Sequence, residues 1–264
     1  MKSPAFRFEV ASLSDPGQIR TLNEDGVAVD KALKFAVVTD GMGGHRAGDL
    51  ASRLALDSIV GRLRGRAKQP SALSPQWVKE TVEAANTVVY STARQQAKRT
   101  GMGTTLAMAV FDEQQGIFAH VGDSRIYRLR NGQLELLTRD DTMLNDQVEL
   151  GLIAVENAGD SHNRHLVTQA LGMGEQVIVH VREERVCEGD VYLLCSDGLN
   201  DLVGEKDIEV IIDSLKTNLP LTARHLVQLA NDNGGHDNVT VALVRVVSDK
   251  PRGWLGRFFG RLAN

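Results

Sequence analysis

The feature that most constrains the fold is a short apolar run that ends abruptly in an acid and a group of glycines. Residues 35–38 are apolar, and the sequence Thr-Asp-Gly-Met-Gly-Gly follows at positions 39–44. An apolar run of this length, bounded by turn-forming residues, predicts a buried strand. Glycine allows the backbone to come close to a neighbouring group. The pattern therefore predicts a strand that places Asp40 at the edge of a sheet, in a turn whose backbone can come close to a neighbouring group.

The same arrangement occurs at three other aspartates. Asp123 lies in Gly-Asp-Ser between two apolar runs, Asp197 follows the run at 191–195, and Asp237 precedes the run at 239–244. A single Asp-Gly pair is an ordinary turn at the end of a strand, and each aspartate taken alone could be a turn or cap residue. Four acids in the same context indicate carboxylates that converge at one end of a sheet. Pairs about 5 Å apart would repel by roughly 3 kcal/mol at an effective dielectric constant near 20.

Divalent cations bound by the four carboxylates would offset this repulsion. Oxygen ligands without a histidine or cysteine cluster favour Mg²⁺ or Mn²⁺ over Zn²⁺. Two such ions about 3.5–4 Å apart can hold a bridging water as hydroxide and polarise a phosphoryl oxygen. Asp40 is the expected bridge between the ions, and the carbonyl of Gly41 can join it because glycine lets the backbone approach.

The periodicity of apolar residues predicts an α+β fold. Strands are expected at 6–12, 27–30, 34–39, 104–111, 116–121, 125–129, 134–136, 177–186, 190–195 and 238–247, and helices at 46–66, 74–98, 142–151, 164–171, 204–215 and 222–231. The strands from 104 to 136 are expected to form one antiparallel meander. Because strands cluster and helices come in pairs, without βαβα alternation, we expect two antiparallel sheets packed face to face with a helix pair on each outer face.

Composition and motifs exclude several classes of protein. A net charge of −4 gives no electrostatic basis for binding nucleic acid. The sequence has no apolar run of the roughly 20 residues that cross a bilayer and no signal-peptide core. Cys187 and Cys195 make no disulfide framework, so a reducing, cytoplasmic location is expected. Neither cysteine has an arginine six residues later, which argues against a cysteine-nucleophile phosphatase, and no Walker-type phosphate loop occurs.

Six motifs occur in the order found in a known enzyme family. They are Arg-Thr-Leu-Asn-Glu-Asp at 20–25, Asp-Gly-Met-Gly-Gly-His at 40–45, Gly-Met-Gly-Thr-Thr at 101–105, Gly-Asp-Ser-Arg at 122–125, Leu-Cys-Ser-Asp-Gly at 194–198 and Asp-Asn-Val-Thr at 237–240. With these motifs the chain resembles the metal-dependent serine/threonine phosphatases of the PP2C class (PPM family), particularly the small bacterial members. The resemblance runs from about Phe8 to Val247. It implies a four-layer αββα sandwich with the metal ions at one end of the sheets.

The resemblance also implies the metal ligands. Asp40 would bridge two Mn²⁺ or Mg²⁺ ions, and the Gly41 carbonyl would bind one of them. Asp197 and Asp237 would bind the other ion, and Asp123 would join Asp197 at a third, weaker site.

Other roles follow from the same resemblance. Glu24 would hold a metal-bound water, while Asp25 and Asn238 would orient the ligands from behind. Arg20 would bind the substrate phosphate through the paired N–H groups of its guanidinium, whose planar fork suits this role. Without the motif, Arg20 would be interpreted as a solvated surface arginine.

The insertion from Thr138 to Gly174 matches the flap that shapes substrate access in the family. One departure is Met42, which stands where some eukaryotic relatives have a histidine proposed as general acid. His45 is near in sequence but is more simply a solvated loop residue. The domain is expected to span 1–248, and the basic, aromatic tail at 249–264 could contact a partner or a membrane surface, fold back on the domain or be disordered.

The predicted function is removal of phosphate from phosphoserine and phosphothreonine in proteins by a water that bridges two metal ions. Its expected counterparts are a bacterial Ser/Thr kinase and that kinase's substrates, and the expected oligomeric state is a monomer. Two alternatives stay open: a catalytically silent phosphoprotein-binding module of the same fold, and a hydrolase of small phosphate esters. Loss of Asp40, Asp197 or Asp237 would mark a silent module, and all three are present.

Overall fold

The computed structural model describes residues 6–44, 47–68, 73–95, 101–112, 114–153 and 166–248. Its centre is two antiparallel sheets. One sheet has the order β1 (Phe6–Asp15), β11 (Val239–Ser248), β10 (Val191–Cys195), β7 (Arg125–Arg130), β8 (Gln133–Leu136). The other has the order β2 (Asp25–Asp30), β3 (Phe35–Met42), β5 (Leu106–Phe111), β6 (Gln115–Val121), β9 (His180–Arg185), and β4 (Gly103–Thr104) pairs with β3 beside this path.

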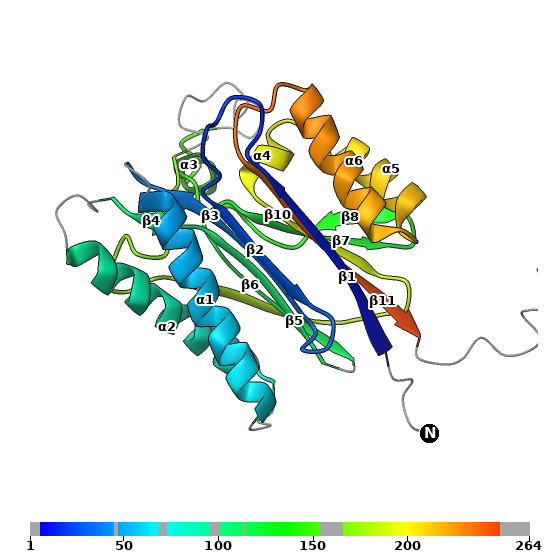
Figure 1. Ribbon diagram of the computed structural model, residues 1–264, viewed down its shortest axis with the longest axis horizontal. Coiled ribbons are helices and arrows are strands. Elements are labelled where there is room, and N and C mark those ends of the chain that lie inside the picture. The colour runs from blue at the N-terminus through cyan, green and yellow to red at the C-terminus, as the bar shows by residue number, and fades with distance from the viewer. Residues whose placement is uncertain are drawn as a thin grey trace, which may run out of the picture.

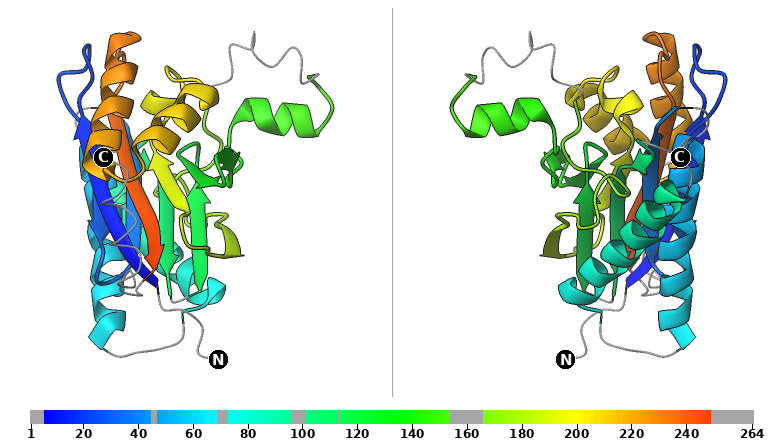
Figure 2. Two further views of the ribbon diagram at one scale, coloured as in Figure 1. Left: turned by 90° about the vertical axis from the view of Figure 1, so that its right-hand side faces the viewer. Right: turned by 90° about the vertical axis from the view of Figure 1, so that its left-hand side faces the viewer.

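Helices cover the outer face of each sheet (Figure 1). The helices α1 (Ala47–Lys68) and α2 (Pro75–Arg94) lie on the sheet that contains β3. The helices α4 (Asp197–Asn200), α5 (Glu205–Leu215) and α6 (Leu219–Asp232) lie on the other sheet. The helix α3 (Met143–Glu149) extends away from both sheets (Figure 2). The predicted four-layer αββα sandwich is confirmed.

Strand β3 shows why the apolar run at 35–38 is continuous. Phe35 and Val37 pack against α1 and α2, whereas Ala36 and Val38 point into the core between the two sheets. Successive side chains of a strand point to opposite faces, so a strand buried on both faces has no polar positions. All four side chains are fully or almost fully buried. The run therefore fixes β3 as a central strand between two hydrophobic layers.

The predicted meander of four strands is wrong. Strands β5 and β6 belong to one sheet, whereas β7 and β8 belong to the other. The chain crosses between the sheets at Gly122, whose φ of +92° lies in the left-handed region that glycine favours. Its backbone is held there by Asp141, whose N–H donates to the Gly122 carbonyl and whose Oδ2 accepts from the Gly122 N–H.

The predicted helix at 164–171 is also wrong over the described residues 166–171. Val167 instead forms an isolated bridge with Thr142, and Leu171 forms one with Thr104. These contacts with distant segments override the helical spacing of the local apolar residues. In the first part of the flap the predicted helix is present as α3. Residues 154–165 of the flap, His45 and the tail at 249–264 lie outside the described residues.

Candidate active site

The register of the strands brings three of the four predicted aspartates to one end of a sheet. Cys195, the last residue of β10, pairs with Arg125 on one side and Val241 on the other. The chain leaves β10 toward Asp197, enters β7 from Asp123 and enters β11 from Asp237. Since each aspartate stands two to four residues from this pairing point, the three side chains meet beyond the strand ends.

The fourth aspartate, Asp40, belongs to the second sheet. Asp40, near the end of β3, pairs with Asp25 at the start of β2. Its backbone is fixed by Thr105, whose N–H donates to the Asp40 carbonyl at 2.8 Å and whose Oγ1 accepts from the Asp40 N–H at 3.2 Å. The hydroxyl of Thr105 also lies 2.6 Å from that of Ser124, in the loop that contains Asp123. This contact ties the two sheets together at the site.

A pocket of about 450 Å³ opens where these strand ends converge. It is lined by Arg20, Glu24, Asp40, Gly41, Met42, Gly43, Thr105, Asp123, Leu166, Val167, Asp197, Asp237 and Asn238. Every residue predicted as a metal ligand or phosphate contact lines this pocket. Asp25 lies behind the lining, where its Oδ2 accepts from the hydroxyl of Ser196 at 2.8 Å.

The carboxylates of the pocket disfavour one another's charge. Loss of surrounding water, followed by repulsion from Asp25, Asp197 and Asp123, raises the pKa of Asp40 well above its ordinary value. Burial is also the main cause that raises the pKa of Asp123 to about 8, of Asp25 to about 7 and of Asp197 to about 6. Repulsion adds to each shift, from Asp201 and Asp237 in the case of Asp197. Without a cation, these carboxyl groups therefore bind protons more readily than ordinary carboxyl groups do.

The donor set fits hard divalent cations. The pocket's potential ligands are carboxylate oxygens and a glycine carbonyl, and none of its described lining residues is histidine or cysteine. Two buried carboxylate oxygens, Oδ1 of Asp197 and Oδ1 of Asp25, have no hydrogen-bond partner. A buried, unpartnered carboxylate oxygen is costly. A positive ion in the pocket would satisfy the first of these oxygens and reverse the pKa shifts.

Asn238 holds the loop that carries Arg20 and Glu24. Its Nδ2 donates to the carbonyls of Pro16 and Leu22 at 3.0 and 2.9 Å, and its Oδ1 accepts from the Glu24 N–H at 2.8 Å. All hydrogen-bonding groups of the Asn238 amide thus act on one loop. The loop in turn places Arg20 at the rim of the pocket.

Glu24 lies at the beginning of α1. Its Oε1 accepts from the backbone N–H of Asp49, in the first turn of the helix, at 3.3 Å. The first N–H groups of a helix have no partner within the helix and carry partial positive charge. This contact orients one oxygen of Glu24, while the residue still lines the pocket.

Reasoning from the sequence missed Asp140, which is the partner of Arg125. Arg125 follows Asp123 closely in sequence, but its guanidinium is bound to Asp140, from Nε at 3.0 Å and from Nη2 at 2.7 Å. Repulsion from Asp140 also helps to raise the pKa of Asp123. The sequence signal was present, because Asp140 is another acid that follows a predicted strand. Asp201, one helical turn after Asp197, was missed as well, and its charge raises the pKa of both Asp123 and Asp197.

Comparison with known proteins identifies relatives over most of the chain. The family model for protein phosphatase 2C matches residues 20–232. The serine/threonine phosphatase stp of Listeria monocytogenes is 37% identical over 239 residues, which cover 88% of this chain and 93% of the relative.

Solved structures agree with this. A crystal structure of the Mycobacterium tuberculosis serine/threonine phosphatase PstP/Ppp matches with a TM-score of 0.84 at 33% identity, over 91% of this chain and 99% of that chain. The catalytic domain of PstP in complex with two manganese ions matches with a TM-score of 0.82 at 34% identity, over 92% of this chain and 100% of that chain.

Proposed function

The chain belongs to the protein phosphatase 2C family and is a metal-dependent phosphatase of phosphoserine and phosphothreonine, and we propose that the acidic pocket at the strand ends is its active site. The observation that carries this assignment is the convergence of Asp40, Asp123, Asp197 and Asp237 in one pocket with Arg20 at its rim. Four carboxylates and an arginine match the needs of cation binding and phosphate binding respectively.

The proposed ligands of two core ions are Asp40 between them, the Gly41 carbonyl on one, and Asp197 and Asp237 on the other. Asp123 would share a third ion with Asp197, and Glu24 would contribute through a water. When bound, two Mn²⁺ or Mg²⁺ ions supply an activated water and neutralise the charge of the transferred phosphoryl group. The PstP catalytic domain, crystallised with two manganese ions, supports this number and kind of ion.

Arg20 is proposed to bind the phosphate of the substrate. Its guanidinium now donates from Nη2 to Asp237 Oδ2 at 2.8 Å and from Nε to the His236 carbonyl at 3.3 Å. Half of the side chain is exposed, so it can turn toward a phosphate in the pocket without leaving a buried group unpaired. A guanidinium then holds two phosphate oxygens through parallel hydrogen bonds.

No described side chain of the pocket is an evident general acid. The lining carboxyl groups would be kept deprotonated by bound metal ions, and Met42 stands where some eukaryotic relatives have a histidine. We therefore propose that the leaving serine or threonine oxygen takes its proton from water in the pocket. The chain's own residues would act by binding, positioning and charge compensation.

The substrates are phosphoproteins, and a bacterial Ser/Thr kinase is the proposed counterpart of the enzyme. The flap, Thr138 to Gly174, is proposed to shape access, because its residues Leu166 and Val167 form an apolar part of the lining. A monomer is the proposed state. Among the described residues, no helix is long and apolar enough to cross a membrane.

The direct test is hydrolysis of a phosphothreonine peptide with Mn²⁺, with a chelator, and with the Asp40→Asn variant plus Mn²⁺. We expect turnover that requires the metal and falls by at least about a thousandfold in the variant, since Asp40 is the proposed bridge. A folded wild-type protein that turns over no phosphopeptide with any metal would favour the silent binding module. Faster turnover of a nucleotide than of the phosphopeptide would favour the hydrolase of small phosphate esters.

A further inference from the structure

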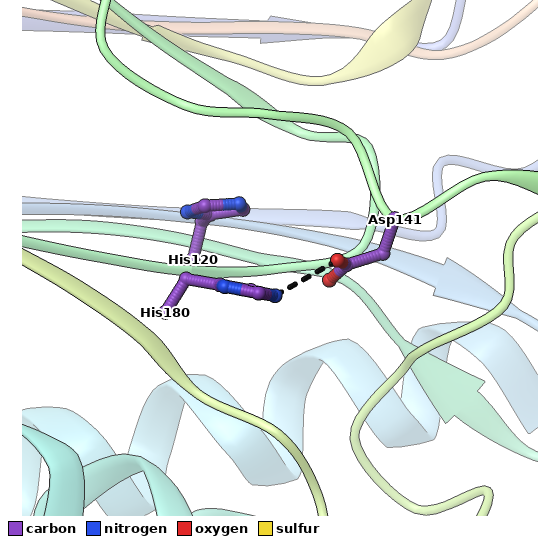
Figure 3. A group of neighbouring side chains, drawn as sticks. All are labelled: His120, Asp141 and His180. Carbon is purple, nitrogen blue, oxygen red and sulfur yellow. Dashed lines mark hydrogen bonds and ion pairs between the residues drawn. The ribbon is translucent and has the colours of Figure 1, made fainter. Parts of the chain in front are cut away.

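A second group of potential metal ligands lies outside the carboxylate pocket. His120 on β6, His180 on β9 and Asp141 at the start of the flap meet at the edge of one sheet (Figure 3). One ring nitrogen of each histidine and one carboxylate oxygen of Asp141 lie within 4.8 Å of one another. The two imidazole rings are stacked, with centroids 4.8 Å apart and planes 19° from parallel. The proposed phosphatase chemistry uses none of these side chains.

The hydrogen bonds around His120 and Asp141 leave free lone pairs. His120 Nε2 lies 2.8 Å from the backbone carbonyl of Arg139. A carbonyl can only accept, so Nε2 carries the hydrogen and Nδ1 of the neutral ring is bare. Burial, with the nearby His180 adding to it, holds the pKa of His120 below its ordinary value, which keeps the ring neutral.

Asp141 is anchored in a similar way. Its Oδ2 accepts from the Gly122 N–H at 2.9 Å, and its Oδ1 lies 2.9 Å from Nε2 of His180. One oxygen is thus fixed by the backbone while the other faces the histidines. Histidines that bind metals commonly donate their second nitrogen to a carbonyl, and ligating carboxylates are themselves held by hydrogen bonds. The contact of His120 with the Arg139 carbonyl and that of Asp141 with the Gly122 N–H are supporting contacts of these two kinds.

We propose that His120, His180 and Asp141 form a binding site for a transition-metal ion of the Zn²⁺ class, distinct from the carboxylate pocket. Two imidazoles and one carboxylate are a common zinc ligand set, with a water or another ligand in the fourth position. The carboxylate pocket offers oxygens only. The ligand chemistry therefore assigns Mg²⁺ or Mn²⁺ to the pocket and a more nitrogen-preferring ion to the sheet edge.

Ion binding requires a small movement, and His180 is the residue able to make it. Ligands about 2.0–2.2 Å from a tetrahedral ion lie roughly 3.4 Å apart, closer than the 4.8 Å limit of the present cluster. Stacked rings must also rotate before their lone pairs converge on one point. His120 and Asp141 are buried and anchored, whereas the side chain of His180 is 40% exposed and belongs to β9, the last strand of its sheet.

The position of the site links it to the flap and to the phosphatase pocket. The backbone of Asp141 donates to Gly122, the residue before Asp123, and accepts from Thr168, the residue after Val167. Both Asp123 and Val167 line the phosphatase pocket. An ion held at this point would tie the base of the flap to β6 and β9. Zinc should therefore raise thermal stability as well as bind.

The test measures zinc binding by equilibrium dialysis in excess Mg²⁺, on the whole 264-residue chain with the substitution Asp40→Asn, which weakens the carboxylate pocket. We expect one zinc ion per chain and a higher Tm with zinc. His180→Gln and Asp141→Asn, added singly, should weaken this binding at least tenfold and remove the rise in Tm. In Asp141→Asn, the new amide oxygen can still accept from the Gly122 N–H. In His180→Gln, the new amide can still donate to the Asp141 carboxylate. Both variants should therefore fold. His225→Gln, at an exposed histidine of α6, is the matched control and should bind as before.

Two results would overturn the proposal. The first is no zinc uptake in excess Mg²⁺ by the protein that retains all three ligands. The second is equal uptake by that protein and by both ligand variants, which would place the ion elsewhere. Thermal melting without zinc shows whether each variant is folded, so a loss of binding in a variant that melts like its parent supports the site.

Discussion

Arg20 and Asp237 form an ion pair that joins two segments 217 residues apart in the sequence. Nη2 of Arg20 lies 2.8 Å from Oδ2 of Asp237, and the two side chains are 52% and 33% exposed. An ion pair this exposed contributes at most about 1 kcal/mol to stability. The pair matters for function, because Arg20, the proposed phosphate contact, is here bound to Asp237, a proposed metal ligand. A cation that binds Asp237 would break this ion pair and leave the guanidinium of Arg20 free to contact the substrate phosphate.

Arg20→Lys should therefore affect substrate binding far more than stability. Lysine keeps the charge but offers no fork of parallel donors. We expect the KM for a phosphothreonine peptide to rise about tenfold in the presence of Mn²⁺, while Tm changes by no more than a few degrees. Steady-state kinetics and thermal melting measure these quantities. Arg7→Lys, at an exposed ion pair with Glu9, is the control and should change neither. An unchanged KM would remove Arg20 from the phosphate site.

The part of the site that sequence could predict depends on local patterns. An acid two positions before or after an apolar run is visible in the sequence, and strand ends are where antiparallel register brings side chains together. Asp40, Asp123, Asp197 and Asp237 all followed this rule. The layers were predicted from the clustering of strands and the pairing of helices, and β3, buried on both faces, lies between helices and the second sheet as that prediction requires.

The part that sequence could not predict depends on tertiary contacts. No local feature of the sequence distinguishes a tight turn within a meander from a crossing between sheets. The crossing at Gly122 is stabilised by the contacts of its backbone with Asp141. Likewise Arg125 is close to Asp123 in sequence but binds Asp140, fifteen residues away. The group of His120, Asp141 and His180 is assembled from three separate segments, so no spacing rule for metal ligands reveals it.

Asp40→Asn should stabilise the protein when no metal is present. The carboxyl group of Asp40 is crowded by Asp25, Asp197 and Asp123, and its pKa is raised because its charge is disfavoured. An amide of the same shape removes that charge and can still donate a hydrogen bond to Asp197. We expect a gain of about 1–2 kcal/mol in the free energy of unfolding at pH 8 with a chelator. Urea unfolding measures it, and Mn²⁺ should stabilise the variant less than the wild type. A loss of stability with the chelator would contradict the repulsion argument.

The stability of the metal-free protein should fall as the pH rises. The folded-state pKa is raised to about 6 for Asp197, about 7 for Asp25 and about 8 for Asp123, from an ordinary value of 3.8. The folded state therefore binds protons more tightly than the unfolded state. This contribution is complete below about pH 4 and is lost as the pH rises through about 6 to 8. We expect Tm with a chelator to decrease from about pH 5 to 8.5. Mn²⁺ should flatten or reverse the trend, because it binds the deprotonated acids. A chelator-treated Tm that rises over this range would refute the assignment.

Asn238→Asp should damage both stability and activity. The aspartate cannot donate to the carbonyls of Pro16 and Leu22, and it brings a further negative charge to the acidic pocket. We expect a loss of about 2–4 kcal/mol in the free energy of unfolding and a lower kcat, since the loop also places Arg20 and Glu24. Asn233→Asp, at an exposed asparagine that donates to one carbonyl, should cost about 1 kcal/mol or less. Equal effects of the two substitutions in urea unfolding would show that Asn238 has no special positioning role.

Gly41 of the pocket and Gly48 of α1 lie too close together for either to carry a side chain. A Cβ on Gly48 would lie 2.6 Å from the Gly41 carbonyl oxygen and 2.8 Å from Oε1 of Glu24, and a Cβ on Gly41 would lie 2.1 Å from the Gly48 oxygen. Neither position can accept a side chain unless the backbones separate. The glycines that follow Asp40 in sequence are thus explained in part by the approach of α1.

Gly48→Ala and Gly61→Ala form a matched pair within α1. Alanine at position 48 must push the helix away from β3, which would displace the Gly41 carbonyl and Glu24 together. Alanine at position 61 meets no atom within 4 Å, so it should only gain the higher helix propensity of alanine, about 0.5–1 kcal/mol. We expect Gly48→Ala to lower Tm and to reduce Mn²⁺-dependent phosphopeptide turnover at least tenfold, whereas Gly61→Ala raises Tm and keeps full turnover. Full activity in Gly48→Ala would show that the pocket does not depend on this backbone contact, and that the Gly41 carbonyl need not be held in place to bind metal.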